Sequence, residues 1–265
     1  MSHFRTTEIS NPKFESNNLR FITVKSKHLK GRGDICVFVP EGNTNTNLPI
    51  AILLHGVYGS AWSWSLSGGA HQTVQEMINL LKIKPMTLVM PSDGLWGDGS
   101  GYTKHSGLDF EKWIVEDVIK AVKELIPQVK NTTKTFISGL SMGGFGALRL
   151  GAKYGNVFDA ISAHSAITEL NQMEEFVEES LEEYVQETPE DESVLKTILN
   201  NQKNLPPLRF DCGRDDILIK HNRLLSKELE ACNIPHEYQE FEGKHEWEYW
   251  QKHLKDTLLF FNKFV

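Results

Sequence analysis

The chain has 265 residues, of which 40% are hydrophobic and 24% are charged, as in ordinary globular proteins. Its 35 acidic and 28 basic side chains give a formal net charge of −7, which argues against a nucleic-acid partner. No apolar run approaches the ~20 residues of a membrane span, and the N-terminus carries no apolar leader segment. We therefore expect a cytoplasmic protein without a membrane partner.

The first predicted elements are a hairpin and a buried strand. Segments 19–26 and 33–40 alternate between apolar and polar residues and are separated by a short polar stretch, which is typical of two antiparallel strands. A polar turn is expected at 41–49. The continuous apolar run 50–55 predicts a strand buried on both faces, and 71–82 has the pattern of an amphipathic helix.

The middle of the chain alternates strands and helices. Residues 86–91 predict another buried strand, which is followed by a glycine-rich loop at 94–102. Apolar residues at helical spacing predict one helix over 108–129. The stretch 134–140 predicts a strand that passes almost directly into a helix at 143–155.

The last third contains an acidic insertion. After a predicted strand at 158–165, residues 166–204 combine irregular and helical patterns, and positions 169–192 hold eleven acidic and no basic residues. Such a run predicts a solvated face. Its apolar side carries Phe176, Val177, Leu181, Tyr184 and Val185. The remaining predicted elements alternate again, with strands at 207–213 and 235–241 and helices at 219–233 and 245–264.

Buried strands that alternate with amphipathic helices predict an α/β fold, in which a mostly parallel sheet has helices on both faces and an antiparallel hairpin at its start. We expect a single domain over residues 1–265, with a cap-like acidic helical insertion at about 166–204. Ligands of such sheets bind beyond the carboxyl ends of the parallel strands. Functional residues are therefore expected in the loops that follow the strands.

One such junction carries the pattern G-x-S-x-G, as Gly139-Leu140-Ser141-Met142-Gly143. In a nucleophile elbow the serine lies on a strained turn between a strand and a helix, and the glycines leave room for that turn. The pattern alone is weak, but here a strand is predicted before it and a helix after it. We therefore predict Ser141 as a catalytic nucleophile; a tight turn with a capping serine is the alternative.

A serine nucleophile needs a base, and the base needs an acid that orients it. In the elbow fold these follow the serine in the order acid, then histidine. His245 comes directly after the last predicted strand and is the predicted base. The acid should follow the preceding strand, where Asp215 and Asp216 both lie in the loop. From the residues alone either carboxylate can be the orienting acid.

The oxyanion of an acyl-transfer reaction needs two N–H donors. The amide of Met142, just after the nucleophile, is one predicted donor. The second should come from the loop after the first buried strand, and we predict the amide of Val57, since Gly56 lets the backbone approach closely. His55 precedes the predicted acid and base in the chain, so a structural role is expected for it.

Aromatic side chains lie in the loops that should border the site. Trp62 and Trp64 follow the predicted oxyanion loop, and Trp96 and Tyr102 lie in the glycine-rich loop. They are candidates for binding substrate, as an acyl pocket or as a platform for a sugar or aryl group; packing beneath the loops is the alternative. His164, at the end of a predicted strand, is a further candidate for lining the site.

Motifs for metals and nucleotides are incomplete. The sequence HEWEY begins like a zinc-binding H-E-x-x-H helix but has Tyr249 in place of the second histidine. The glycine-rich loop lacks the Lys-Ser/Thr of a phosphate-binding loop. Cys36, Cys212 and Cys232 have no spacing of a disulfide framework or zinc site. We expect no cofactor and no metal.

Several motifs together resemble one family: LLHGVYGS, VMPSDG, FISGLSMGGFGALRL, and the tail from CGRDD to KHEWEYW. They resemble the esterase branch of the α/β-hydrolase superfamily that contains esterase D, S-formylglutathione hydrolases, small bacterial tributyrin esterases and mycolyltransferases. The resemblance runs from about Ile22 to Leu259. It implies a Ser-His-Asp triad of Ser141, His245 and Asp216, which selects between the two aspartates.

The resemblance also implies hydrolysis of short-chain acyl esters, through an acyl-enzyme intermediate, on a small-molecule ester substrate. The alternatives are an S-formylglutathione thioesterase, an acyltransferase of the same fold and a carbohydrate acetyl or feruloyl esterase. A cysteine expected in the loop of formylglutathione hydrolases is absent from GVYGS. A catalytically inactive binding protein is disfavoured because all three triad residue types occur in order, and a homo-oligomer is left open.

Overall fold

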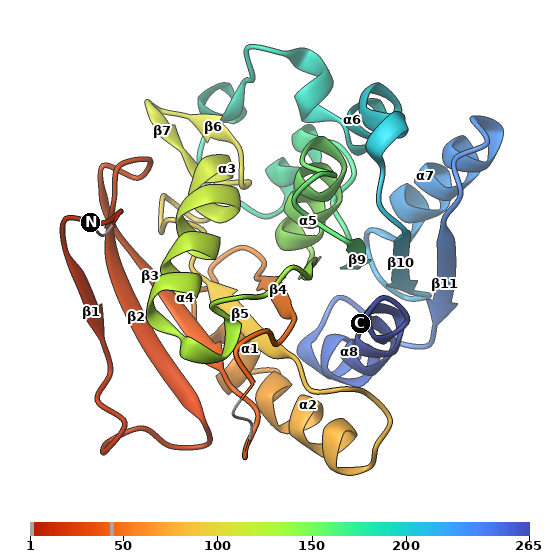
Figure 1. Ribbon diagram of the computed structural model, residues 1–265. Helices are drawn as coiled ribbons and strands as arrows, with labels where there is room; N and C mark the ends of the chain where they lie inside the picture. Colours follow the sequence, from red (N-terminus) through yellow and green to blue (C-terminus); the bar gives the residue numbers. More distant parts are fainter. Residues whose placement is uncertain (1–2, 43–44) are drawn as a thin grey trace.

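The computed structural model describes residues 3–42 and 45–265, so positions 43 and 44 of the predicted polar turn lie outside the described residues. Its centre is a nine-stranded sheet in the order β1-β2-β3-β5-β4-β8-β9-β10-β11, shown in Figure 1. The strands of this sheet are β1 (Thr7–Ile9), β2 (Leu19–Ser26), β3 (Gly31–Phe38), β4 (Ile50–Leu54), β5 (Thr87–Pro91), β8 (Thr135–Leu140), β9 (Ala160–His164), β10 (Leu208–Gly213) and β11 (Glu237–Phe241).

The N-terminal part of the sheet is antiparallel, as predicted. β2 and β3 pair along their full length, and β3 joins the rest of the sheet by pairing antiparallel with β5. The short edge strand β1, which pairs with β2, was not predicted from the sequence, because three residues are too few to show a pattern. A second small sheet pairs β6 (Lys104–His105) with β7 (Leu108–Asp109).

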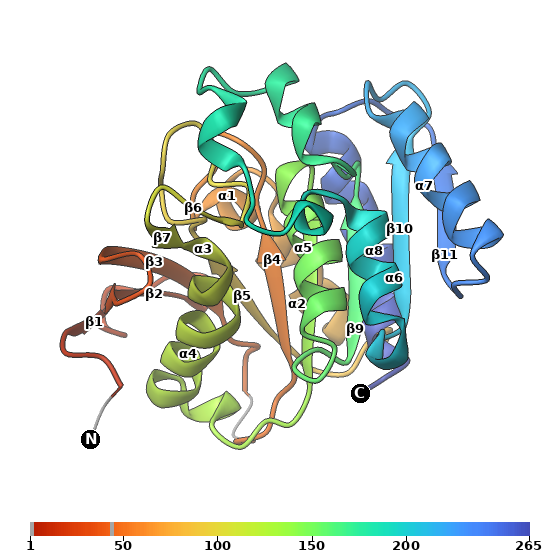
Figure 2. The same cartoon turned by 90° about the horizontal axis from the view of Figure 1, so that it is seen from above.

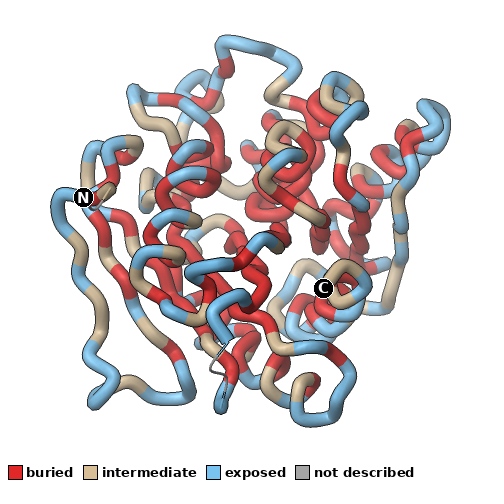
Figure 3. Tube along the Cα trace, viewed as in Figure 1, coloured by how far each residue is buried: buried red, intermediate tan, exposed pale blue. Residues whose placement is uncertain are grey.

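From β5 to β11 all neighbouring strands are parallel. β4, β5, β8, β9 and β10 are buried at every position, in agreement with the continuous apolar runs of β4 and β5, whereas β11 at the edge is exposed or half-buried (Figure 3). The carboxyl ends of these parallel strands lie at one edge of the sheet, so the loops that follow them lie near one another.

Helices cover both faces of the sheet (Figure 1). The helices are α1 (Ser63–Leu66), α2 (Ala70–Asn79), α3 (Phe110–Lys112), α4 (Ile119–Leu125), α5 (Met142–Lys153), α6 (Val194–Asn201), α7 (Ile219–Ala231) and α8 (Trp247–Asn262). One hydrophobic core lies between the sheet and the face with α1, α2 and α8, and includes Trp64, Val74 and Phe261. The other core, on the face with α3 to α7, includes Trp113, Phe145 and Leu225.

The region predicted as one helix over 108–129 is divided. β7 and α3 are followed by a π-helical segment at Trp113–Val118, then α4, then a 3₁₀ turn at Pro127–Val129. Proline lacks the N–H that an α-helix would need at position 127, which accounts for the end of α4. Most of the predicted apolar face is nevertheless buried, and the indole of Trp113 donates to Ser92 O at 2.8 Å.

The acidic part of the insertion forms 3₁₀ turns at Leu170–Glu175, Leu181–Tyr184 and Pro189–Glu192, not the predicted acidic helix; α6 begins only after it. Repulsion between carboxylates three and four residues apart disfavours an α-helix there. As expected, the apolar side chains of the insertion pack on the core that lies on the face with α3 to α7; they are Phe176, Val177, Leu181 and Tyr184. Val185 is 64% exposed, so its predicted place on the apolar side is wrong. Figure 2 shows the insertion passing from the end of β9 over β6 to α6.

Across residues 3–42 and 45–265, no helix combines the length and the apolar character that crossing a membrane requires.

Candidate active site

The G-x-S-x-G pattern forms a sharp turn between β8 and α5. Ser141 has φ 55° and ψ −121°, a conformation that L-residues other than glycine rarely adopt. A Cβ on Gly139 would overlap the backbone of Gly143, and a Cβ on Gly143 would overlap the carbonyl groups of Leu54 and His55. The two glycines of the motif are therefore required by close backbone approach, as the sequence pattern indicated.

Ser141, His245 and Asp216 form a hydrogen-bonded line. Ser141 Oγ lies 3.0 Å from His245 Nε2, and His245 Nδ1 lies 3.0 Å from both carboxylate oxygens of Asp216. The three side chains come from three different loops, which follow β8, β11 and β10. Ser141 is 2% exposed and Asp216 3% exposed, while the imidazole edge remains reachable from solvent. The structure thus brings the three predicted residues together.

The structure also distinguishes the two neighbouring aspartates. Asp215 is exposed, and its backbone amide donates to Gly243 O at 3.1 Å. Asp216 is buried and accepts a hydrogen bond from the Leu218 amide at 2.8 Å. Burial raises the pKa of Asp216, but the hydrogen bond and the charge of His245, with the Leu218 amide, outweigh it and the net pKa is lowered. Asp216 is therefore a carboxylate at neutral pH.

The imidazole of His245 contacts two aromatic side chains. The ring of Trp250, from α8, stands perpendicular to it at a centroid distance of 5.0 Å. The ring of Phe176, from the insertion, lies 5.4 Å away at an angle of 31°. The insertion therefore borders the candidate site directly. The sequence placed Phe176 on an apolar side but gave no sign that it would reach His245.

The two predicted oxyanion donors lie beside the serine. Met142 N is the first amide of α5, whose first intrahelical bond is donated by Phe145 N to Ser141 O at 3.1 Å. Gly56, just before Val57, approaches so closely that a Cβ on it would lie 3.3 Å from Ser141 Cβ. Within the described residues, neither the Val57 amide nor the Met142 amide has a hydrogen-bond acceptor. Both remain available to a ligand.

His55 holds the loop that carries Val57. Its Nδ1 donates to Gly56 O at 2.7 Å, and its Nε2 accepts from the Asp93 amide at 3.1 Å. With only 2% of its surface exposed, His55 occupies the structural role expected for it.

The predicted substrate-binding residues divide into two groups. Trp62 is 46% exposed, and Trp96 is half-buried against His105 and Tyr184, so both lie near the surface of the loops that were expected to border the site. Trp64, Tyr102 and His164 are essentially without exposed surface. Their predicted contact with a substrate is therefore not supported, because no surface of theirs is accessible.

Each of these three buried side chains has a polar partner that explains its position. Trp64 Nε1 donates to Leu54 O at 2.9 Å, and Tyr102 Oη donates to His55 O at 3.0 Å. His164 lies between Asp211 and Thr257, at 3.0 and 2.9 Å. They support the strands beneath the site rather than its rim. Loop membership predicted proximity to the site, but it could not show which face of the sheet each side chain would take.

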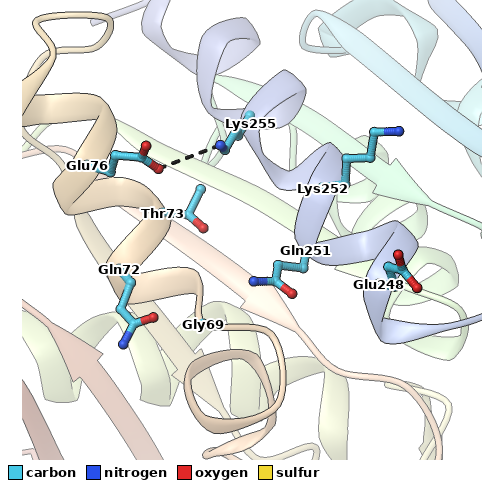
Figure 4. A pocket seen from close by; sticks show the side chains of 8 residues that line it. All are labelled: Gly69, Gln72, Thr73, Glu76, Glu248, Gln251, Lys252 and Lys255. Carbon is cyan, nitrogen blue, oxygen red and sulfur yellow. Dashed lines mark ion pairs between the residues drawn. The ribbon is translucent and has the colours of Figure 1, made fainter.

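A hollow of about 560 Å³ lies between α2 and α8 (Figure 4). Its walls carry hydrophilic side chains, including an ion pair between Lys255 and Glu76 with a 3.6 Å separation. None of its lining residues belongs to the hydrogen-bonded line, so it is not the candidate active site. In the described part of the chain, no group of three or more histidine, cysteine or acidic residues is arranged to hold a metal ion.

Comparisons with known proteins relate the chain to esterases. Residues 26–261 match the family described as "Putative esterase". An acetyl esterase from Caldicellulosiruptor saccharolyticus is 28% identical over 235 residues, which cover 82% of this chain and 84% of that protein. A ferulic acid esterase structure superposes with a TM-score of 0.81 at 22% identity, covering 98% of this chain and 100% of the other. The structure of an S-formylglutathione hydrolase from Staphylococcus aureus gives 0.77 at 18% identity, covering 97% and 99%.

At these identities the two solved structures show the fold, and they confirm the α/β-hydrolase architecture that the sequence predicts. The family match covers most of the chain and confirms the resemblance read from its motifs. The chain belongs to the family described as "Putative esterase" and is a carboxylic ester hydrolase.

Proposed function

We propose that the protein is a serine carboxylesterase that hydrolyses short-chain acyl esters through a triad of Ser141, His245 and Asp216. The observation that carries the proposal is the continuous line of hydrogen bonds of 3.0 Å from Ser141 Oγ through His245 to Asp216. The serine's strained turn and the two unoccupied amides of Val57 and Met142 support it, since acyl transfer needs both a projected nucleophile and oxyanion donors.

The proposed reaction begins when Ser141 Oγ attacks the ester carbonyl while His245 Nε2 accepts the hydroxyl proton. Asp216 holds the imidazole with Nδ1–H toward itself and stabilises the imidazolium that forms. The amides of Val57 and Met142 donate to the tetrahedral oxyanion. His245 then protonates the leaving alcohol, and a water molecule cleaves the acyl-enzyme by the same steps, with His245 as its general base.

Two observations favour a small acyl group. Ser141 is almost completely buried, and the insertion places Phe176 against the imidazole, so the space around the nucleophile is confined. The acetyl esterase relative, which the chain matches over most of both lengths, is in keeping with acetate as the acyl group. The exposed Trp62 offers a flat apolar surface on which the ring of a sugar or aryl alcohol could lie.

The direct test is hydrolysis of p-nitrophenyl esters from acetate to octanoate, beside methyl ferulate and S-formylglutathione, with Ser141→Ala as the control. The proposal expects the highest kcat/KM for acetate to butyrate, and a loss of about 10³-fold or more in the variant. A preference for S-formylglutathione or methyl ferulate would replace the proposed substrate class. Added methanol separates hydrolysis from acyl transfer, because a transferase gives methyl ester in place of free acid.

A further inference from the structure

The glycine-rich loop after β5 packs against both residues whose amides are the predicted oxyanion donors. Gly99 is buried, and a Cβ on it would overlap Met142 Sδ and lie 3.3 Å from Val57 Cγ1. The residue that follows Val57 is also bound to this loop, because Tyr58 N donates to Asp98 O at 2.8 Å. The position of the glycine-rich loop therefore affects the position of both amides.

The backbone of Tyr58 is strained, and its contact with the glycine-rich loop restrains it. Its φ of 55° lies in the left-handed region, which residues with a Cβ rarely adopt. The side chain is 67% exposed, so packing of the ring contributes little to keeping this conformation. Strained residues persist only where their surroundings fix them. The hydrogen bond from Tyr58 N to Asp98 O therefore restrains the turn that carries the Val57 amide.

Asp98 is in turn held by the acidic insertion, through carboxylate–amide hydrogen bonds in both directions. Asp98 N donates to Glu179 Oε1 at 3.0 Å, and Glu178 N donates to Asp98 Oδ2 at 2.7 Å. Tyr184, also from the insertion, donates from its hydroxyl to Gly99 O at 2.8 Å. Amides bind charged acceptors more strongly than neutral ones. The insertion thus fixes the part of the glycine-rich loop that contacts the oxyanion donors.

The Glu179 side chain lies directly on the glycine-rich loop. A Cβ on Gly97 would overlap the Glu179 carboxylate. Within residues 3–42 and 45–265, the buried Oε2 of this carboxylate has no hydrogen-bond partner, which is an unfavourable placement for a charged group. Such a carboxylate would turn toward water unless another contact retained it. The hydrogen bond from the Asp98 amide to Oε1 is that contact.

We propose that Glu179 is a positioning residue for the oxyanion hole, whose carboxylate fixes the backbone of Asp98 and, through it, the turn that carries the Val57 amide. The inference rests on the proposed function, in which the Val57 and Met142 amides bind the oxyanion. Without an acceptor at position 179, the Asp98 amide loses its partner and the loop can shift. The oxyanion forms only as the reaction proceeds, so misplaced donors lower kcat more than they raise KM.

The test compares Glu179→Ala with Glu179→Gln on p-nitrophenyl acetate, a neutral ester that the charge of the insertion does not repel. Alanine removes the acceptor, whereas glutamine removes the charge but keeps an amide oxygen that can accept from Asp98 N. Loss of a whole oxyanion donor costs about 10²- to 10³-fold in kcat, and a displaced donor should cost less. We expect Glu179→Ala to lower kcat about 10-fold with KM within about twofold, and Glu179→Gln to stay within about twofold in both.

Inhibition by a small trifluoromethyl ketone gives a second readout. Such a ketone adds to the nucleophilic serine and places an oxyanion between the two donor amides, so its adduct resembles the transition state. Its Ki should rise in Glu179→Ala by about the factor by which kcat/KM falls. A general loss of stability would leave the Ki of the folded enzyme unchanged.

Glu192→Ala is the matched control. Glu192 is a half-buried carboxylate of the same acidic segment, and it also accepts from a backbone amide, at 2.9 Å, but that amide belongs to Gln186 within the insertion. Its removal should leave kcat within about twofold. Wild-type kcat in folded Glu179→Ala would overturn the inference. An equal loss in Glu179→Gln or in Glu192→Ala, or an unchanged Ki in Glu179→Ala, would overturn it as well.

A second pair of variants decides the inference if Glu179→Ala does not fold. Asp98→Ala removes the acceptor of the Glu178 amide, and Asp98→Asn keeps an oxygen that can accept from it. The same fall in kcat is expected in Asp98→Ala alone, and wild-type kcat in that variant would overturn the inference. Failure of the proposed function is separate, because it would appear as full activity in Ser141→Ala.

Discussion

His164 and Asp211 form a hydrogen bond of 3.0 Å between Nδ1 and Oδ1, the same length as that between His245 and Asp216. Thr257 Oγ1 lies 2.9 Å from His164 Nε2, and it takes the position that Ser141 Oγ has beside His245 Nε2. The chain thus contains the same arrangement of hydroxyl, imidazole and carboxylate twice. His164, Asp211 and Thr257 have no exposed surface, so only the line of Ser141 can meet a substrate.

The two aspartates are therefore expected to respond differently to the same substitution. Asp216→Asn should lower kcat about 10³- to 10⁴-fold with little change in stability, because asparagine favours the wrong imidazole tautomer. Asp211→Asn removes the partner of the buried Arg209, at 2.8 Å, and should cost about 3–5 kcal/mol of unfolding free energy. Urea unfolding and p-nitrophenyl acetate kinetics on both variants measure the contrast. Equal effects of the two substitutions on both properties would contradict it.

Acid should destabilise the protein through Asp211. Burial raises the pKa of this carboxyl, but the charges of His164 and Arg209 lower it by more than burial raises it. The net pKa falls from its ordinary 3.8 to about 2. Because the folded pKa is the lower one, the contribution is fully present above pH 3.8 and is lost as pH falls toward about 2. The total is about 2 kcal/mol, of which about 1 kcal/mol is lost by pH 3. Urea unfolding at pH 6 and pH 3 should show this loss in the wild type and a smaller one in Asp211→Asn.

Gly143 should not tolerate a side chain. A Cβ there would overlap the carbonyl groups of Leu54 and His55, and backbone atoms cannot move aside by changing rotamer. Gly143→Ala is expected to lower stability by about 3 kcal/mol or more and to abolish esterase activity. Gly31→Ala is the control, since its Cβ would meet nothing closer than Leu29 O at 3.4 Å. Thermal melts and activity assays of the two variants should differ strongly; a Gly143→Ala protein like the wild type would contradict the elbow geometry.

The insertion should select against anionic acyl groups. Residues 169–192 carry eleven acidic and no basic side chains, and this segment touches His245 through Phe176. Asp98 accepts from the Glu178 amide at 2.7 Å and from the Tyr58 amide at 2.8 Å, which joins the acidic segment to the loop of Val57. Because the segment that carries Phe176 also carries these carboxylates, we expect them to repel an anionic substrate, and we expect salt to screen that repulsion.

A matched pair of substrates tests this selection. Mono-p-nitrophenyl succinate and p-nitrophenyl butyrate have acyl chains of similar length and differ in charge. Raising the salt from about 0.02 M to about 0.5 M should increase kcat/KM several-fold for the anionic ester only. Glu178→Gln, which leaves in place the hydrogen bond from the backbone amide of residue 178 to the Asp98 carboxylate, should reduce the salt effect. An equal response of both esters to salt would show that the acidic segment does not act on the substrate.

Much of the sheet and the hydrogen-bonded set of Ser141, His245 and Asp216 could be predicted from the sequence. Continuous apolar runs identify buried strands such as β4 and β5 because both faces of these strands are covered. Ser141 and His245 could be paired because each follows a parallel strand, and such strands end at one edge of the sheet. Asp215 and Asp216 could not be separated in this way, since adjacent loop residues differ only in the direction of their side chains.

The remaining differences arise from contacts that no local pattern records. The side chain of His164 points to the face of the sheet that α8 covers, where it contacts Thr257. Its position at the end of a strand therefore did not place it at the substrate. The acidic segment does not form the predicted helix. Repulsion between its carboxylates disfavours a helix, and the size of that repulsion depends on which carboxylates have partners in the fold.

The most direct test of the account is covalent labelling with a fluorophosphonate, read by intact-protein mass spectrometry and peptide mapping. Such reagents react with a serine that a neighbouring base activates. The account predicts one adduct on the wild-type protein, located on Ser141, no adduct on Ser141→Ala, and much slower labelling of His245→Ala. An undiminished adduct on folded Ser141→Ala, or ester hydrolysis by a wild-type protein that never labels at Ser141, would contradict the assignment of the nucleophile.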